Sequence, residues 1–256
     1  MSVLFTASIM KVGAHIDDTR ALVQAWDPTV DDGANVERIV DSNLLGLPSR
    51  SRAHDVMTRA LRPRFIAPES GIIEALGVLS TNAEAFRDAC YYEMARVDGL
   101  VAAFMTEQVQ EWWDDGRVAI DSGDARRWID KLGADGRIPE WSPNIRERVA
   151  RSLLAALRDV GRLVGVQSSP RKEIARPGIT TGGFAYTAFR LHQQGASSRA
   201  LISSPSWKLW LLDASRVEEQ LQRLASLGIV YYSAAGSTRR IDWRAETLAE
   251  VARGAV

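Results

Sequence analysis

The sequence has a single cysteine, Cys90, among its 256 residues. One cysteine excludes an intramolecular disulfide and any zinc site that needs several cysteines. The chain also lacks an apolar run near the roughly 18 residues that a membrane-spanning helix requires. Its start shows no signal-peptide pattern. We therefore expect a cytoplasmic protein that makes no membrane contact.

Motifs typical of enzymes are also missing. There is no glycine-rich loop ending in Lys-Ser or Lys-Thr, which would cradle a nucleotide phosphate. There is no Gly-x-Ser-x-Gly elbow, which would present a nucleophilic serine. The three histidines, His15, His54 and His192, are far apart, and none has a second ligand at metal-binding spacing. We predict a protein without catalytic residues, cofactor or metal.

Net charge is absent as well, because 32 basic side chains balance 32 acidic ones. The charges are nevertheless segregated along the chain. Residues 17–41 hold seven acidic and two basic side chains, whereas residues 47–65 hold five arginines and one aspartate. Residues 137–176 hold nine basic and four acidic side chains. A neutral total can therefore hide a basic face, and a polyanionic partner responds to the local field.

The arginines of residues 47–65 are the first candidate binding residues. A helix is expected over residues 51–62, with a proline ending it at position 63. Three of the arginines are spaced by seven and three residues, so they share one helix face. The other two extend the patch beyond the helix ends, and such a face can contact nucleic-acid phosphates. The alternative is a solvated face that forms salt bridges with the acidic segments. The patch consists of Arg50, Arg52, Arg59, Arg62 and Arg64.

Residues 215–243 predict a helix that leads directly into a β-hairpin. Ser215 and Glu218 have the spacing of a capping box, and Gly228 is typical of a helix end. Two strands are expected over residues 229–233 and 239–243, joined by a turn of small residues. This order is that of the end of a winged helix, in which the helix can enter a DNA groove beside the hairpin. The apolar stripe of the helix is Val217, Leu221, Leu224 and Leu227.

A similar pattern occurs 67 positions earlier, with a hairpin expected over residues 163–167 and 172–176. Six apolar or glycine positions match at this constant offset, which is compatible with an internal duplication and also with chance. The matching positions are Leu154, Leu157, Val160, Gly161, Leu163 and Ile174.

Both expected hairpins carry adjacent cations. The first has Arg171 and Lys172, and the second has Arg239 and Arg240. A hairpin beside DNA would place these side chains near phosphates. The alternative is that these are the exposed arginines that strand ends often carry, and many winged helices bind only protein.

The apolar periodicity before residue 117 is helical throughout. A loop rich in glycine, aspartate and proline precedes residue 142, and a second break follows at Pro177-Gly178. We therefore expect a mainly α protein. It comprises a helical bundle over residues 1–135, a first winged-helix-like unit over 136–178 and a C-terminal winged-helix domain over 179–256.

Several short motifs, in this order and spacing, resemble the BrxA family of the BREX bacteriophage-defence systems. The resemblance runs over nearly the whole chain, and it implies a NusB-like helical part and a non-enzymatic role in binding nucleic acid. It supplies no catalytic residues. The motifs are Asn43-Leu44-Leu45, Ser49-Arg50-Ser51-Arg52, Leu61-Arg62-Pro63-Arg64-Phe65, Tyr92-Glu93, Gly183-Phe184-Ala185-Tyr186 and Trp207-Lys208-Leu209-Trp210-Leu211-Leu212.

The leading hypothesis is therefore a non-enzymatic accessory protein that binds double-stranded DNA mainly through phosphate contacts, with other BREX subunits as further partners. Two alternatives stay open. The protein could bind RNA as an antitermination factor does, or it could be a protein-interaction scaffold without nucleic-acid binding.

Overall fold

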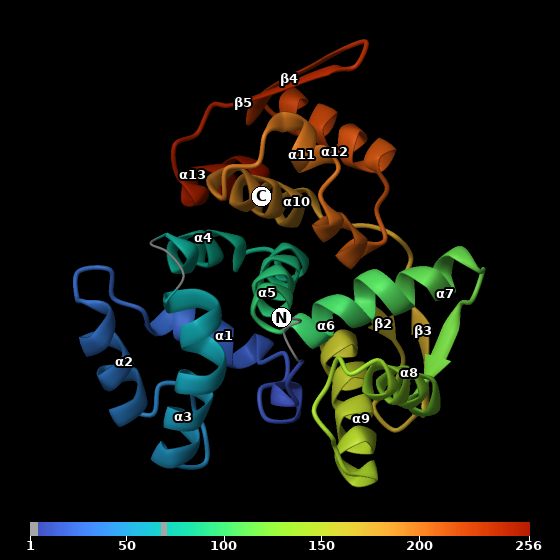
Figure 1. The fold of residues 1–256 in the computed structure, drawn as a ribbon. Helices are drawn as coiled ribbons and strands as arrows, with labels where there is room; N and C mark the ends of the chain where they lie inside the picture. The colour runs from blue at the N-terminus through green and yellow to red at the C-terminus, as the bar shows by residue number, and fades with distance from the viewer. Residues whose placement is uncertain (1–4, 68–70) are drawn as a thin grey trace.

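Helix α5 (Ala83–Val97) lies at the centre of the computed structural model, which describes residues 5–67 and 71–256 (Figure 1). Asn82 begins this helix, because its side chain accepts hydrogen bonds from the backbone N–H groups of Glu84 and Ala85. Nearly every residue from Ala85 to Ala95 is buried, as expected of a helix that neighbours cover on all sides. The elements before it are η1 (Ser8–Met10), α1 (Ile16–Ala25), α2 (Asp32–Asp41), α3 (Arg50–Val56), the π-helical η2 (Met57–Ile66) and α4 (Ile72–Leu79).

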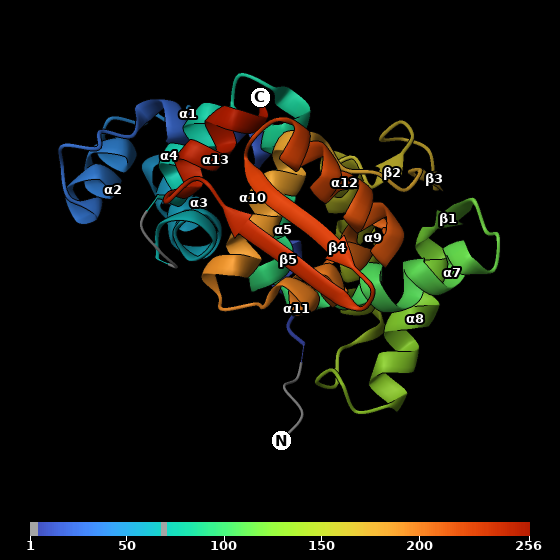
Figure 2. The same cartoon turned by 90° about the horizontal axis from the view of Figure 1, so that it is seen from above.

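Three groups of elements pack around α5. In both views, α1 to α3 lie on one side of α5 and the segment from α7 to β3 lies on the other. The C-terminal elements cover a third side (Figures 1 and 2). These later elements are α6 (Gly99–Ala103), the π-helical η3 (Phe104–Val109), α7 (Gln110–Asp114), β1 (Ala119–Asp121), α8 (Ser122–Ala134), α9 (Pro143–Asp159), β2 (Leu163–Val164), β3 (Arg171–Ile174), α10 (Thr181–Gln193), α11 (Ser198–Ile202), the 3-10 helix η4 (Pro205–Trp210), α12 (Ala214–Ser226), β4 (Val230–Ala235), β5 (Thr238–Trp243) and α13 (Leu248–Ala255).

One hydrophobic core crosses both predicted domain boundaries. Helix α10 packs against α5, and α13 packs against α4, so C-terminal elements complete the core of the N-terminal half. The prediction of a mainly helical fold is confirmed. The three-part division, the NusB-like arrangement and the winged-helix geometry stay predictions.

The first predicted hairpin is present, but it belongs to a three-stranded antiparallel sheet in the order β1-β3-β2. Leu163 of β2 pairs with Ile174 of β3, and Ile120 of β1 pairs with Lys172. Strand β1 precedes α8, and the sequence pattern did not predict it, because three residues are too few to show an alternation. The extra strand places the buried Ile120 opposite Lys172.

The second predicted hairpin is also present. Strands β4 and β5 pair from Val230 with Trp243 to Ala235 with Thr238. They are joined at Gly236, whose φ of +56° favours glycine. Leu221 of the preceding helix α12 has an exposed fraction of 0%, so the helix packs its predicted stripe inward.

Three details of α12 differ from the prediction. Its N-cap is Asp213, whose side chain accepts from the backbone N–H of Arg216, so Ser215 is not the capping residue. Glu218 does not complete a capping box, because its carboxylate is bound by Arg239 and Tyr232 of the hairpin. Leu227 is 52% exposed and lies outside the stripe, since the helix ends at Ser226.

The offset of 67 residues holds for part of the two units. Helices α9 and α12 end at Asp159 and Ser226, and Gly161 and Gly228 share a φ of +74°. The equivalence fails at the second strand. Ile174 pairs with the first residue of its partner strand, whereas its counterpart Ile241 pairs with Tyr232, two residues further along β4.

No helix within residues 5–67 and 71–256 combines the length and apolar character needed to cross a membrane.

Candidate nucleic-acid interface

Four of the five predicted patch arginines are exposed on α3 and η2, namely Arg50, Arg52, Arg59 and Arg62. Helix α3 begins at this surface because the Ser49 hydroxyl accepts from the backbone N–H of Arg52 at 3.2 Å. The guanidinium groups therefore lie on the first turns of a capped helix and on the π-helical segment that continues it.

Aspartates neutralise this surface only in part. Arg50 pairs with Asp41 of α2 at 2.6 Å, and Asp55 is shared by Arg52 and Arg59. In the described part of the chain, Arg62 forms no ion pair. Four cations thus face two carboxylates, and exposed pairs of this kind are weak enough to exchange partners.

Arg64 is not part of this surface, which corrects the expected patch. Its side chain is 2% exposed, and its guanidinium donates to the backbone carbonyls of Val12, Gly13 and Ala14 at 2.7–3.2 Å. Burial lowers the pKa of Arg64 to about 10. Pro63 does not end the helix as expected but lies inside η2, and Arg64 follows it into the interior.

The first hairpin exposes only one of its two predicted cations. Arg171 is exposed and forms no ion pair within the described ranges, whereas Lys172 is 5% exposed. Side chains alternate between the two faces of β3, so Lys172 and Ile174 both point inward. The Lys172 ammonium donates to the carbonyls of Val166, at 2.8 Å, and Ser169. Lys172 therefore does not share the exposed face of Arg171, as the expected phosphate contact of both side chains would need.

Both predicted arginines of the second hairpin form ion pairs with acidic residues. Arg239 pairs with Glu218 at 2.9 Å, and Arg240 pairs with Asp242 at 2.7 Å. The Tyr232 hydroxyl donates to the other Glu218 oxygen at 2.9 Å. Hydrogen bonds from Arg239 and then Tyr232 lower the pKa of Glu218. Glu218 thus fastens the hairpin to α12.

The structure does not bring the predicted cations onto one surface. Helix α3 and the first sheet lie on opposite sides of the molecule in both views, and the β4–β5 hairpin lies on a third (Figures 1 and 2). The predicted cations therefore form three separate candidate surfaces.

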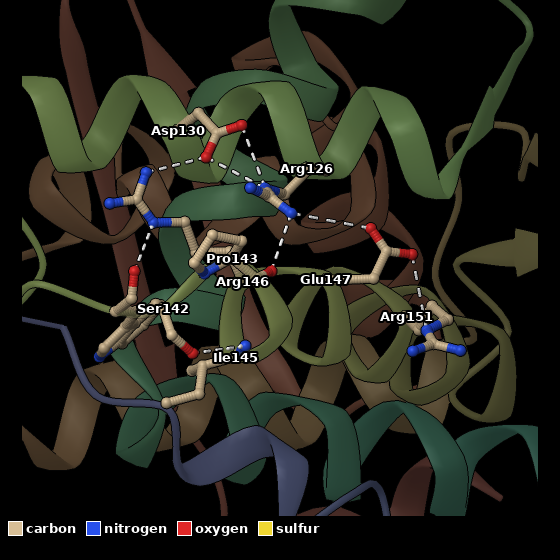
Figure 3. Close-up of polar contacts among 9 residues, drawn as sticks. Arg126, Asp130, Ser142, Pro143, Ile145, Arg146, Glu147 and Arg151 are labelled. Atoms are coloured by element: carbon tan, nitrogen blue, oxygen red, sulfur yellow. Dashed lines mark hydrogen bonds and ion pairs between the residues drawn. The ribbon is translucent and has the colours of Figure 1, made fainter.

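A basic cluster that the motif search missed lies between α8 and α9. Figure 3 shows Arg126 and Arg146 both directed at Asp130, while Glu147 lies between Arg126 and Arg151. Three guanidinium groups thus share two carboxylates. The sequence signal that could have found this cluster is the basic excess of residues 137–176.

Arg151, at the end of this cluster, also lines a cavity of about 300 Å³ beside the first hairpin. Arg158 and Lys172 are the other charged residues of its lining. No group of three or more metal-ligating side chains occurs in residues 5–67 and 71–256.

The model of the BrxA family matches residues 4–188. The chain belongs to the BrxA family. This membership associates the protein with BREX bacteriophage defence and confirms the resemblance seen in the short motifs. The BrxA match includes the α3 surface, the first sheet and most of α10, and it ends before α12 and the second hairpin. A comparison with curated proteins finds no match.

Within the BrxA match, Glu93 joins α5 to α10. Its carboxylate is fully buried and accepts from the Tyr186 hydroxyl at 2.8 Å and from Arg190 Nε at 2.9 Å. Arg96 Nε donates to its other oxygen at 2.6 Å. The motifs Tyr92-Glu93 and Gly183-Phe184-Ala185-Tyr186 therefore meet in space, although about 90 residues separate them.

Asp88, five residues earlier on α5, completes this joint. It accepts from the backbone N–H and hydroxyl of Thr180, at 2.9 and 2.8 Å, and from Trp210 Nε1 at 3.0 Å. Gly183 allows the close approach of the two helices, because a Cβ there would lie 2.4 Å from the Cβ of Asp88. The motifs Tyr92-Glu93 and Gly183-Phe184-Ala185-Tyr186 thus belong to a structural joint, whereas Ser49-Arg50-Ser51-Arg52 lies on the exposed α3 surface.

Proposed function

We propose that this BrxA-family protein binds double-stranded DNA as a non-enzymatic accessory protein of a BREX system, mainly through phosphate contacts. The observation that carries the proposal is the α3 surface, where Arg50, Arg52, Arg59 and Arg62 face only two carboxylates. Guanidinium groups bind phosphate oxygens with paired hydrogen bonds. Such contacts position a protein on a duplex without reading its sequence.

The ion-paired arginines of the second hairpin favour a different function for the hairpin surface, the docking of a protein partner. Arg239 and Arg240 are each held by a carboxylate, which leaves little positive charge for DNA. Beside them, Tyr231 is half exposed, and exposed aromatic residues are common in protein interfaces. Another BREX subunit is the partner that the family membership makes plausible.

The ligand class can be tested by fluorescence anisotropy with three labelled probes of equal length: duplex DNA, single-stranded DNA and structured RNA. We expect the duplex to bind most tightly, and an excess of unlabelled RNA to compete poorly. Tighter binding of RNA would instead favour an antitermination-like role. No binding of any probe at low salt would leave the protein-docking function.

A further inference from the structure

The cavity beside the first hairpin is lined by cations without any acidic residue. It lies between α9, the start of α8 and the loop over residues 165–170. Its charged lining residues are Arg151, Arg158 and Lys172, and hydroxyls of Ser122, Ser168 and Ser169 add polar groups. Because acidic and basic residues are equal in number over the whole chain, a cavity lined by three cations and no carboxylate is a marked local excess.

Among the three cations of the lining, Lys172 is the one that is buried without a carboxylate partner in the described part of the chain. It is 5% exposed, and its ammonium donates only to the two backbone carbonyls of Val166 and Ser169. An ammonium has three N–H donors, so one remains without a protein acceptor among the described residues. No carboxylate within those residues lies at ion-pair distance from it. Buried charges are normally paired, and this one lines the cavity.

The two arginines pair with carboxylates that lie outside the cavity lining. Arg158 is held by its neighbour Asp159 at 2.5 Å, but Asp159 is not part of the lining. Arg151 lies 3.6 Å from Glu147, a carboxylate that Arg126 also approaches at 3.9 Å (Figure 3). Arg158 uses Nε and Nη2 on Asp159 and keeps Nη1 for a ligand. The longer contact of Arg151 with Glu147 leaves its guanidinium able to turn toward one.

From this geometry we infer that the cavity is a binding site for a phosphate group. A phosphate offers several oxygen acceptors, and it would meet the third ammonium N–H, two guanidinium groups and serine hydroxyls. Charge-assisted hydrogen bonds of this kind are about twice as strong as neutral ones. The phosphate belongs either to a nucleic-acid backbone or to a small soluble polyphosphate. The site lies away from the α3 surface and does not depend on it.

Calorimetric titration with inorganic pyrophosphate tests the site directly. The test protein is the full-length chain carrying Arg151→Gln and Arg158→Gln, which keep polar side chains at both positions. The matched control is Arg148→Gln, an exposed α9 residue outside the lining. We expect pyrophosphate to bind the parent and the control alike. It should bind the double variant at least about tenfold more weakly, as the loss of hydrogen bonds to charged groups implies. Unchanged thermal unfolding of the variant shows that the fold is intact.

A parallel titration with duplex DNA identifies the source of the phosphate. A weaker duplex affinity in the double variant, with a salt slope smaller by about 0.9 for each lost phosphate contact, assigns the site to the DNA backbone. Loss of pyrophosphate binding with unchanged duplex affinity assigns it to a small polyphosphate. Two results overturn the inference. In the first, the parent and the double variant bind pyrophosphate equally and also bind duplex DNA equally. In the second, the parent does not bind pyrophosphate, and the double variant binds duplex DNA with the affinity of the parent. A parent that binds pyrophosphate but no duplex refutes the proposed function and leaves this site standing.

Discussion

Replacing Glu93 by glutamine should loosen the joint between α5 and α10. The substitution keeps the shape of the side chain and removes its charge, and it directs an amide NH₂ at a hydrogen-bond donor. Arg190, which is 1% exposed, and Arg96 both lose the charge of Glu93. Removing one partner of a buried ion pair costs about 3–5 kcal/mol. We therefore expect the free energy of unfolding of Glu93→Gln to fall by that amount.

Urea unfolding followed by tryptophan fluorescence and far-UV circular dichroism measures this loss. The control is Glu74→Gln, since Glu74 forms an exposed pair with Arg253 at 3.6 Å, and exposed pairs contribute about 1 kcal/mol or less. If Glu93→Gln costs no more than Glu74→Gln, then the buried carboxylate does not hold α10 on α5. The interface would then depend on apolar packing and the close approach at Gly183 alone.

Three further predictions concern the C-terminal unit and the absence of chemistry. Leu221→Ala should lower the free energy of unfolding by about 2–5 kcal/mol, because it empties a fully buried position; a loss below about 1 kcal/mol would contradict the packing of α12. Glu218 has a lowered pKa, so the stability from its hydrogen bonds is complete above its unfolded value of about 4.5 and is lost as the pH falls through the lowered one. An NMR titration of Arg239→Gln should show this pKa rising, and no change would exclude the hydrogen bond. The purified protein should show no nuclease, ATPase or methyltransferase turnover, and turnover abolished by one substitution would refute this.

The helices and both hairpins could be predicted because their signals are local. Apolar stripes, capping residues and helix-ending glycines lie within a few residues of the structure they determine. Gly161 and Gly228 illustrate this, since both take the positive φ expected at a helix end. The N-cap of α12 was misplaced by two residues because Asp213 and Ser215 are both good capping residues, and spacing alone did not separate them.

The binding surface was less predictable because exposure depends on distant partners. Arg64 is buried by carbonyls about 50 residues away in the sequence. The Lys172 ammonium is held by carbonyls of the loop over residues 165–170, and no local pattern predicted that contact. Arg151 and Arg158 gave no motif, and only the fold places them around one cavity.

The joint between α5 and α10 was invisible to sequence reasoning for the same reason. Asp88 and Glu93 are ordinary polar residues on an amphipathic helix until α10 covers them. The family motifs did contain Glu93 and Gly183, but a shared motif does not by itself distinguish a structural contact from a binding residue.

The central claim, phosphate binding by the α3 surface, is tested most directly by the salt dependence of duplex DNA affinity. With four arginines on that surface and a slope of about −0.9 per phosphate, affinity should fall about 150-fold between 50 and 200 mM salt. Arg52→Gln with Arg59→Gln should halve the slope, so that the same change in salt costs only about 12-fold. A control carrying Lys11→Gln and Arg253→Gln removes two exposed cations elsewhere and should keep the slope of the parent. A folded Arg52→Gln, Arg59→Gln variant with the affinity and salt slope of the parent would contradict the claim.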